Sequence, residues 1–374
     1  MLPGYATPEA TAAFAARHVK DSGAASGHYR TAAGLTVGSI GLGSYLGDPD
    51  DATDGAYEEA VAEFVGLGGN LVDSASNYRA QRSERAIGRA LAALVAEGSA
   101  RREELVVCTK GGYLAHDGDY PRNRKEADEW VQRTLVEPKV LATGDLVSGH
   151  AMSPSFLRHQ VAQSRANLQL ETIDVYYLHN PETQLRELDR GEFGKRIHDA
   201  FLTLEGLAEE GRIRAYGCAT WNGFRCAPSS DEYLSLEDMV SIARSIQGEA
   251  HRFRFVQLPF NLAMLEAARF ANQRVAGQLV PLLEAARRLG ITCVASATIL
   301  QARLASGLPP QIAEAFPSIA SDALRAIQFN RSTPHLAATL VGMSQVRHVL
   351  ENLGLAKRPP GPAETVKKLL LKLG

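Results

Sequence analysis

Eight short apolar runs alternate with helical patterns along the chain, and this alternation limits the possible folds more than any other feature of the sequence. The runs have the length and composition of buried strands, and they cover residues 36–41, 69–73, 105–109, 173–178, 214–219, 254–258, 291–296 and 337–341. Strands that alternate with helices build a parallel sheet, and eight such pairs close into a barrel. The sequence therefore predicts an α/β fold, a (β/α)8 TIM barrel in a single domain.

A doubly wound sheet is the main competing fold. Such a sheet would carry a GxGxxG dinucleotide loop after its first strand. Residues 41–45 read Gly-Leu-Gly-Ser-Tyr, but Leu46 stands where the third glycine is required. The missing glycine favours the barrel.

Capping residues mark the starts of several helices between the runs. The signals are Thr7 before Pro8, Ser153 before Pro154, Ser235 with Asp238 three residues later, and Ser344 at the start of the last barrel helix. We expect helices to begin at these positions.

The chain is longer than a barrel requires, and the surplus lies in three segments. We predict an N-terminal arm at residues 1–30, the barrel at 31–357 and a C-terminal tail helix at 358–374. Residues 111–152, after the third strand, form an insertion whose aromatic content favours an ordered lid at the carboxyl ends of the strands. The tail helix is expected to dock on the barrel, because one of its faces is apolar: Val366, Leu369, Leu370 and Leu373.

The composition limits the kind of partner that the chain can bind. With 40 basic and 42 acidic side chains, no basic field attracts nucleic acid or an anionic membrane, so a small-molecule substrate fits best. The four cysteines form no CxxC pair, which predicts buried thiols in a reducing compartment and no metal site. No apolar stretch is long enough to span a bilayer, and the polar N-terminal residues do not fit a secretory signal. These features predict a cytoplasmic protein, and they leave its oligomeric state open.

Four polar residues stand at predicted strand ends or just beyond them. Asp73 ends the second run, Tyr78 follows it in a loop, Lys110 comes directly after the third run and His179 directly after the fourth. The carboxyl ends of barrel strands meet at one rim, so these side chains are expected to lie together although they are far apart in sequence. Taken singly, each has an ordinary structural explanation, such as a turn cap, a rim ion pair or a core histidine.

Together the four residues suit proton transfer to a carbonyl group. An ammonium group beside a tyrosine favours the phenolate and lowers the pKa of the tyrosine, and a carboxylate keeps the lysine charged. A histidine can donate a hydrogen bond to a carbonyl oxygen while the tyrosine supplies the proton. The sequence therefore predicts Asp73, Tyr78, Lys110 and His179 as catalytic residues.

Several longer stretches, which follow one another in a set order, connect the chain to a known family. They are Gly-Leu-Gly-Ser-Tyr at 41–45, Asn70 to Tyr78, the Ser-Glu helix at 82–91, Thr109-Lys110, Ile173 to His179, and Leu207 to Gly217. With these stretches the chain resembles the aldo-keto reductases over roughly residues 30–353. The resemblance implies a catalytic tetrad of the four residues above, with Tyr78 as general acid and NADPH as hydride donor to an aldehyde or ketone; NAD(H) stays possible.

The resemblance also implies which residues bind the cofactor and the substrate. The expected cofactor-binding residues are Gly43, Ser44, Thr220, Gln257, Ser296, Gly342, Met343, Ser344, His348, Glu351 and Asn352. Gln257 helps to hold the nicotinamide, and the residues from Gly342 onward bind the adenosine phosphate and adenine. The expected substrate pocket contains Tyr45, Tyr113 and Trp221.

Three positions depart from the family pattern. Ala219-Thr220 replaces the usual Ser-Asn that holds the nicotinamide carboxamide, and Ser296 stands where an aromatic ring usually supports the nicotinamide. His348, next to Arg347, takes the place of an arginine that often grips the 2′-phosphate. All three changes affect the cofactor rather than the tetrad.

These departures keep two alternatives to carbonyl reduction open. In the first, the tetrad performs redox-neutral acid and base chemistry, such as isomerisation, elimination or cyclisation, with the cofactor absent or permanently bound. In the second, the chain is a non-catalytic sensor or partner-binding subunit, as in the aldo-keto reductase-like β subunits of potassium channels. The complete tetrad argues against the second. The identity of the substrate stays open in each case.

Overall fold

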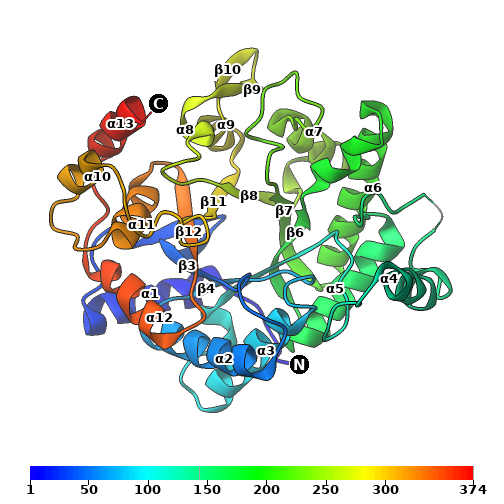
Figure 1. Cartoon of the computed structure of the whole chain (residues 1–374), viewed down its shortest axis with the longest axis horizontal. Helices are drawn as coiled ribbons and strands as arrows, with labels where there is room; N and C mark the ends of the chain where they lie inside the picture. The colour runs from blue at the N-terminus through cyan, green and yellow to red at the C-terminus, as the bar shows by residue number, and fades with distance from the viewer. Residues whose placement is uncertain (143, 374) are drawn as a thin grey trace.

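Eight parallel strands form a closed barrel, surrounded by a ring of helices (Figure 1). The computed structural model describes residues 1–142 and 144–373. Around the barrel the strands follow the order β11-β12-β3-β4-β5-β6-β7-β8. The barrel strands are β3 (Ile40–Gly43), β4 (Leu71–Asp73), β5 (Val106–Gly111), β6 (Ile173–His179), β7 (Ile213–Ala219), β8 (Phe253–Pro259), β11 (Thr292–Ser296) and β12 (Leu336–Gly342). The predicted (β/α)8 barrel is confirmed.

The helices that follow the barrel strands pack against their outer faces. They are α2 (Asp51–Gly66), α3 (Arg82–Ala96), α5 (Pro154–Leu168), α6 (Arg190–Glu209), α7 (Leu236–Gln247), α9 (Leu282–Leu289), α11 (Asp322–Ser332) and α12 (Val346–Leu353). Additional short elements are α8 (Glu266–Arg269), α10 (Pro310–Ala315), the 3₁₀ helices η1 (Arg102–Glu104), η3 (Pro181–Arg186), η4 (Gly248–Ala250) and η5 (Gly354–Lys357), and the hairpin β9 (Ala271–Val275) and β10 (Gln278–Pro281).

Successive strand residues alternate between two separate apolar clusters, which identifies the inner face of the barrel. One cluster, inside the barrel, includes Leu71, Val106, Val175, Phe255, Val294 and Leu340. The next residue along each strand belongs to the larger cluster under the helices: Val72, Val107, Tyr176, Val256, Ala295 and Val341. Counting in steps of two from the inner residues reaches Asp73, Lys110, His179, Gln257 and Ser296, so all five belong to the inner face.

An antiparallel hairpin closes the amino-terminal end of the barrel. It consists of β1 (Tyr29–Ala32) and β2 (Leu35–Gly38), and its Ala32 and Val37 join the apolar cluster inside the barrel. The predicted strand at 36–41 is therefore wrong as a single strand. It spans the end of the hairpin and the start of β3, separated by Ser39, whose N–H bonds back to the His28 carbonyl at 2.7 Å.

The first residues of the chain pack on the same end of the barrel. Helix α1 (Pro8–Ser22) is capped by Thr7, as expected, and buries Phe14. The Ala6 N–H donates to the Asp174 carboxylate at 2.7 Å. The segment that was predicted to be an arm is thus anchored to the amino-terminal end of the barrel.

The insertion after β5 contains helix α4 (Arg124–Val131) and the π-helical turn η2 (Gln132–Val136). These helical parts lie at the periphery, outside the ring of barrel helices (Figure 1). A small apolar cluster around Leu135, Leu141, Ala151 and Phe156 fixes them to α5. The loop at residues 112–118, by contrast, contacts the loops at the carboxyl ends of the strands.

The C-terminal helix α13 (Ala363–Lys372) docks on the barrel beside α10 and α11, as its pattern predicts. Val366 and Leu369 are buried, and Leu370 and Leu373 pack against the core. Across the described ranges 1–142 and 144–373, no helix is long and apolar enough to cross a membrane.

Candidate active site

Three adjacent strands of the barrel position the charged residues of the site. Asp73 is the last residue of β4, Lys110 lies near the end of β5 and His179 is the last residue of β6. Parallel pairing sets Asp73 opposite Cys108, and Lys110 opposite Tyr177. Tyr78 lies in the turn after β4. The structure brings all four predicted catalytic residues together at the carboxyl-terminal rim.

Asp73 and Lys110 form a buried ion pair at the centre of the site. Lys110 Nζ donates to Asp73 Oδ1 at 2.5 Å and to the Ser74 carbonyl at 2.7 Å. The second carboxylate oxygen accepts a hydrogen bond from Gln257 Nε2 at 2.8 Å. Burial disfavours the charge on Lys110, but Asp73 and Tyr78 together raise its pKa, so the ammonium form is kept.

Tyr78 stands over this ammonium group. Lys110 Nζ lies 3.5 Å from the Tyr78 hydroxyl and 5.0 Å from the centre of its ring. Burial raises the pKa of Tyr78, and the opposing effect of Lys110 does not cancel it. The predicted lowering of the tyrosine pKa is therefore wrong for the free protein, because removal from water outweighs one neighbouring charge. The hydroxyl stays protonated at neutral pH and available as an acid.

His179 is a neutral imidazole. Burial, reinforced by Lys110 and His150, lowers its pKa well below the ordinary value. Its ring meets that of Tyr78 edge to face, with 5.9 Å between centroids. Nδ1 is buried and has no hydrogen-bond partner among residues 1–142 and 144–373, so the single ring proton is better placed on Nε2, where it can be donated. A neutral donor beside a tyrosine hydroxyl is suited to polarising a carbonyl oxygen.

A chain of buried polar groups behind His179 was missed by the reasoning from sequence. His150 Nε2 lies 2.9 Å from the His179 carbonyl, and Gln184 Nε2 lies 3.1 Å from His150 Nδ1. Burial lowers the pKa of His150 to about 4, so this ring is neutral and Nε2 must donate to the carbonyl. Arg196 in turn donates to Gln184 Oε1 at 2.6 Å. His150 belongs to the insertion and Gln184 to η3, and neither position carries a sequence pattern that points to the site.

Two of the predicted pocket residues border the site through ring contacts. Tyr45 meets Tyr78 edge to face at 5.0 Å, and Tyr113 meets His179 in the same way at 5.2 Å. Tyr113 is fixed by its hydroxyl, 2.9 Å from Thr183 Oγ1. Trp221 is 47% exposed and is held by its main chain: its N–H donates to the buried carboxylate of Glu182 at 2.7 Å, and its carbonyl oxygen accepts from Arg225 Nε at 2.9 Å. Glu182 is a further residue that the sequence did not indicate.

The residues expected around a nicotinamide have different surroundings. Ser44 uses its hydroxyl inside the protein, donating to the Asp73 carbonyl at 3.1 Å. Gln257 binds Asp73, as described above. Thr220, directly after β7, has a buried hydroxyl that finds no hydrogen-bond partner in the part of the chain that the structure describes. Gly43 and Ser296 are the partly exposed last residues of β3 and β11.

The residues expected at the adenosine end lie together on the loop after β12 and on α12. Gly342 is exposed, Ser344 and His348 are half-buried, and Met343 and Asn352 are buried. Glu351 is exposed and accepts a hydrogen bond from Ser321 at 3.3 Å. The predicted helix start at Ser344 is wrong. Helix α12 begins at Val346, and the side chain of Gln345, which precedes it, makes no capping hydrogen bond.

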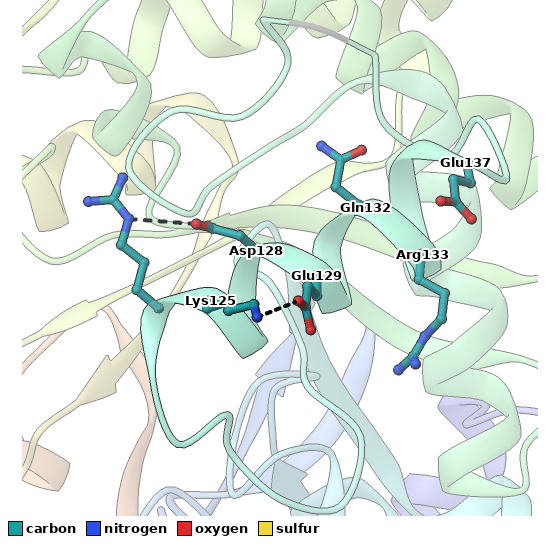
Figure 2. Close-up of a pocket in the computed structure, with 7 residues that line it drawn as sticks. Lys125, Asp128, Glu129, Gln132, Arg133 and Glu137 are labelled. Carbon is teal, nitrogen blue, oxygen red and sulfur yellow. Dashed lines mark ion pairs between the residues drawn. The ribbon is translucent and has the colours of Figure 1, made fainter.

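Two surface hollows lie on the insertion, and none of the four predicted catalytic side chains lines them. The larger, about 710 Å³, is lined mostly by charged residues of α4 and η2, and by Glu137 directly after η2. Figure 2 shows that these side chains pair along the helix, as in Lys125 with Glu129 at 3.7 Å. Such i,i+4 pairs are typical of a solvated helix face. Within residues 1–142 and 144–373, no cluster of His, Cys, Asp and Glu has the arrangement of a metal site.

A comparison with protein families matches residues 39–307 to the aldo/keto reductase family. Among characterised proteins, the chain is 28% identical over 190 residues to the NADH-specific methylglyoxal reductase of Escherichia coli, a match that covers 50% of this chain and 49% of that protein. It is also 28% identical over 188 residues to the D-threo-aldose 1-dehydrogenase of a Pseudomonas species, covering 50% and 51%. The matches thus span about half the length of these relatives.

Solved structures of the same family share the fold. An aldo-keto reductase from Bacillus halodurans, in its holo form, is 18% identical with a TM-score of 0.61, covering 92% of this chain and 96% of that one. An aldo/keto reductase from Klebsiella pneumoniae, in complex with NADP and acetate, is 18% identical with a TM-score of 0.59, covering 90% and 91%. At this level of identity the likeness concerns the fold alone.

Proposed function

This chain belongs to the aldo/keto reductase family, and we propose that it is an oxidoreductase that reduces an aldehyde or ketone group of a small molecule. One observation carries the proposal. A protonated tyrosine stands over a charged lysine that is paired with a buried carboxylate, beside a neutral histidine. This set of groups can donate one proton and one hydrogen bond to the same carbonyl oxygen.

The four residues divide the work as follows. The His179 ring N–H donates to the substrate carbonyl oxygen and orients it. As negative charge develops on that oxygen, the Tyr78 hydroxyl transfers its proton to it. Lys110 stabilises the resulting phenolate, because its ammonium group lies 3.5 Å from the hydroxyl oxygen. Asp73 keeps Lys110 protonated and in place.

NADP(H) is the proposed cofactor, with NAD(H) as the alternative. When bound, the reduced nicotinamide supplies the hydride. The buried Thr220 hydroxyl, which has no partner within the described protein, fits a carboxamide, and Gln257 Oε1 can accept from the same group because the Asp73 contact uses only Nε2. Thr220 and Gln257 would therefore hold the carboxamide. Ser44 has its hydroxyl and its main-chain N–H engaged with the Asp73 carbonyl, so only its carbonyl oxygen, which already accepts from Ser83, could take a further hydrogen bond.

The adenosine end is proposed to lie along β12 and α12. The exposed Gly342 leaves room for a ligand, since a Cβ added there meets only the end of the Leu46 side chain, at 3.6 Å. His348 and the exposed Arg347 are the candidates for contact with a 2′-phosphate. Met343 is enclosed in the core, so only its main chain can take part. The choice between the two cofactors rests on these side chains, and the Escherichia coli relative is named for NADH.

The decisive test is reduction by the wild-type protein and by Tyr78→Phe. We expect stoichiometric oxidation of NADPH or NADH with small aldehydes, methylglyoxal among them, and a loss of about 10²- to 10⁴-fold in kcat for Tyr78→Phe. Tyr120→Phe is the matched control, because Tyr120 is an exposed tyrosine of the insertion, and this variant should keep full activity.

The opposite outcome is equally clear. If folded protein binds neither NADPH nor NADH at millimolar concentration, as measured by quenching of tryptophan fluorescence, the proposal is rejected. Product that forms without consumption of either nucleotide would instead assign the tetrad to redox-neutral acid and base chemistry. That alternative draws on Ser296 at the position where an aromatic support is usual.

A further inference from the structure

Three successive residues directly after Tyr78 adopt left-handed backbone conformations without being glycine. Arg79, Ala80 and Gln81 have φ angles of 49°, 51° and 71°. A left-handed conformation is unfavourable for an L-residue, because it brings Cβ close to the following carbonyl oxygen. Three in a row persist only where surrounding contacts hold them, and strain of this kind concentrates at functional sites.

Arg79 holds the first position of the turn from inside the protein. Its guanidinium is buried, pairs with Asp54 at 2.8 Å and lies 5.0 Å over the Tyr57 ring. Its Nε donates to Ser83 Oγ at 3.0 Å. These contacts attach the turn to α2 and α3.

Gln81 holds the last position and connects it to the insertion. Its Nε2 donates to the carbonyls of Ala115 and His116, both at 3.0 Å. Its Oε1 accepts from Asn167 Nδ2 on α5, also at 3.0 Å. The side chain is fully buried and all its hydrogen-bonding groups are used. Gln81 therefore connects the turn after β4 with the insertion and with α5, which are far apart in the sequence.

Two further contacts fasten the same loop of the insertion to this turn. The Gly118 N–H donates to the Ala80 carbonyl at 2.9 Å. Arg85, one helical turn after Gln81, pairs with Asp117 at 2.6 Å. The loop at residues 112–118 is thus bound to the segment that carries Tyr78.

We propose that Gln81 is a positioning residue, which uses the insertion as a support to hold the turn after β4 so that the Tyr78 hydroxyl stays over Lys110. In this role the insertion supports the position of Tyr78, the proton donor, in addition to any contact that it makes with the substrate. The inference rests on the proposed function, because positioning Tyr78 matters for turnover only if Tyr78 is the proton donor.

The charged and titratable groups around Tyr78 come from four elements. Lys110 comes from β5, Asp73 from β4, His179 from β6 and Tyr45 from the loop after β3. None of them belongs to the turn itself. A change in the turn therefore alters the position of Tyr78 relative to groups that stay fixed on the barrel.

Three variants separate the effect of the hydrogen bonds of the Gln81 side chain from the effect of the backbone strain. We call these hydrogen bonds, to the carbonyls of Ala115 and His116 and from Asn167, the tether. Gln81→Gly tolerates the left-handed backbone and removes the tether. Gln81→Glu keeps the size of the side chain but sets a carboxylate against two carbonyls. Ala80→Gly, in the middle of the same turn, relieves the backbone equally and loses no side-chain hydrogen bond. We expect both Gln81 variants to lower kcat about 10²-fold with little change in KM, and Ala80→Gly to match the wild type.

A second measurement does not depend on turnover. The chain has 11 tyrosines, and the ¹⁹F resonance of Tyr78 in 3-fluorotyrosine-labelled protein is assigned by its loss in Tyr78→Phe. We expect this resonance to shift or broaden in Gln81→Gly and Gln81→Glu and to be unchanged in Ala80→Gly. Circular dichroism and thermal unfolding identify any variant that has lost the fold.

The outcomes distinguish the two proposals. An altered Tyr78 resonance in a protein that reduces no carbonyl would support the tether and reject the proposed function. An unaltered resonance and full activity in folded Gln81→Glu would reject the tether. An effect of Ala80→Gly as large as that of Gln81→Gly would assign the change to backbone freedom, and the tether would again be rejected.

Discussion

Gln257 shows how the role of a residue depends on the partner that the fold gives it. The resemblance assigns it to the nicotinamide, yet its Nε2 donates to Asp73 Oδ2 at 2.8 Å. With Lys110 on the other oxygen, each oxygen of the buried Asp73 carboxylate has a donor. A carboxylate removed from water requires such donors to stay ionised. Gln257 therefore supports the ion pair before any cofactor binds.

Replacing this donor is expected to affect both stability and activity. Gln257→Leu leaves Asp73 Oδ2 without its donor, so the free energy of unfolding should fall by about 1–3 kcal/mol. The pKa of Asp73 should rise further above its ordinary value, because the lost hydrogen bond holds it down, and kcat should fall more than about tenfold as the Lys110 charge is weakened. Denaturant unfolding and steady-state rates measure the two effects.

Gln273→Leu is the control for this prediction. Gln273 is also buried, but its side chain bonds the backbone of Leu234 and Leu236, far in sequence from the tetrad. We expect a similar loss of stability with full turnover. Equal loss of activity in the two variants would mean that Gln257 acts only through the stability of the fold.

The sequence predicted the tetrad because position along a strand carries information. Asp73, Lys110 and His179 stand at the ends of apolar runs, and a parallel barrel brings such ends to one rim. His150 and Gln184 were not predictable in this way, because they come from an insertion and a 3₁₀ helix without periodicity. The predicted direction of the Tyr78 pKa shift was wrong for a related reason. The sequence indicates neighbouring charges, but it does not show how deeply the hydroxyl is buried.

Helix α13 illustrates what a pattern can predict at the level of an element. Its apolar face predicted docking, and the structure buries Leu369 to 3% exposure while Leu371 is 73% exposed. The helix start at Ser344 and the strand at 36–41 were misplaced, because an element boundary depends on local hydrogen bonds that composition does not specify. Element type was therefore easier to predict than element ends.

The two leucines of α13 form a matched pair for experiment. We expect Leu369→Ala to lower the free energy of unfolding by about 2–4 kcal/mol, because it leaves a cavity against α10 and α11. Leu371→Ala should change it by less than about 0.5 kcal/mol, since the side chain lies in water. Urea unfolding of both variants measures the difference, and equal values would show that α13 contributes nothing through docking.

Buried neutral histidines make the stability of the whole molecule dependent on pH. Burial lowers the pKa of His28 to about 3 and that of His150 to about 4. When the pH is below the ordinary histidine pKa of about 6.5, these histidines are protonated in the unfolded chain but stay neutral in the folded chain. The free energy of unfolding therefore falls as the pH falls. Each group contributes up to about 1.4 kcal/mol per pH unit, until its folded pKa is reached.

Unfolding by urea at pH 7, 6, 5 and 4.5 tests this expectation. The free energy of unfolding should decrease over that range. In His28→Gln its slope against pH should be smaller, by the amount that corresponds to the uptake of about one proton on unfolding. His198→Gln is the control, because His198 is exposed and its loss should leave the slope unchanged. A slope in His28→Gln equal to that of the wild type would show that His28 takes up its proton in the folded state as readily as in the unfolded chain.

Closure of the barrel also sets a time at which the molecule can first be complete. The closing pair joins β3 to β12, with Ile40 opposite Thr339, about 300 residues later in the chain. At roughly 5–20 residues per second, a ribosome needs about 15–60 s to synthesise the part between them. For that interval β3 has only one of its two barrel neighbours, and its other edge is open to incorrect pairing. An active molecule therefore requires that the open edge of β3 stays free of incorrect partners until β12 has been synthesised.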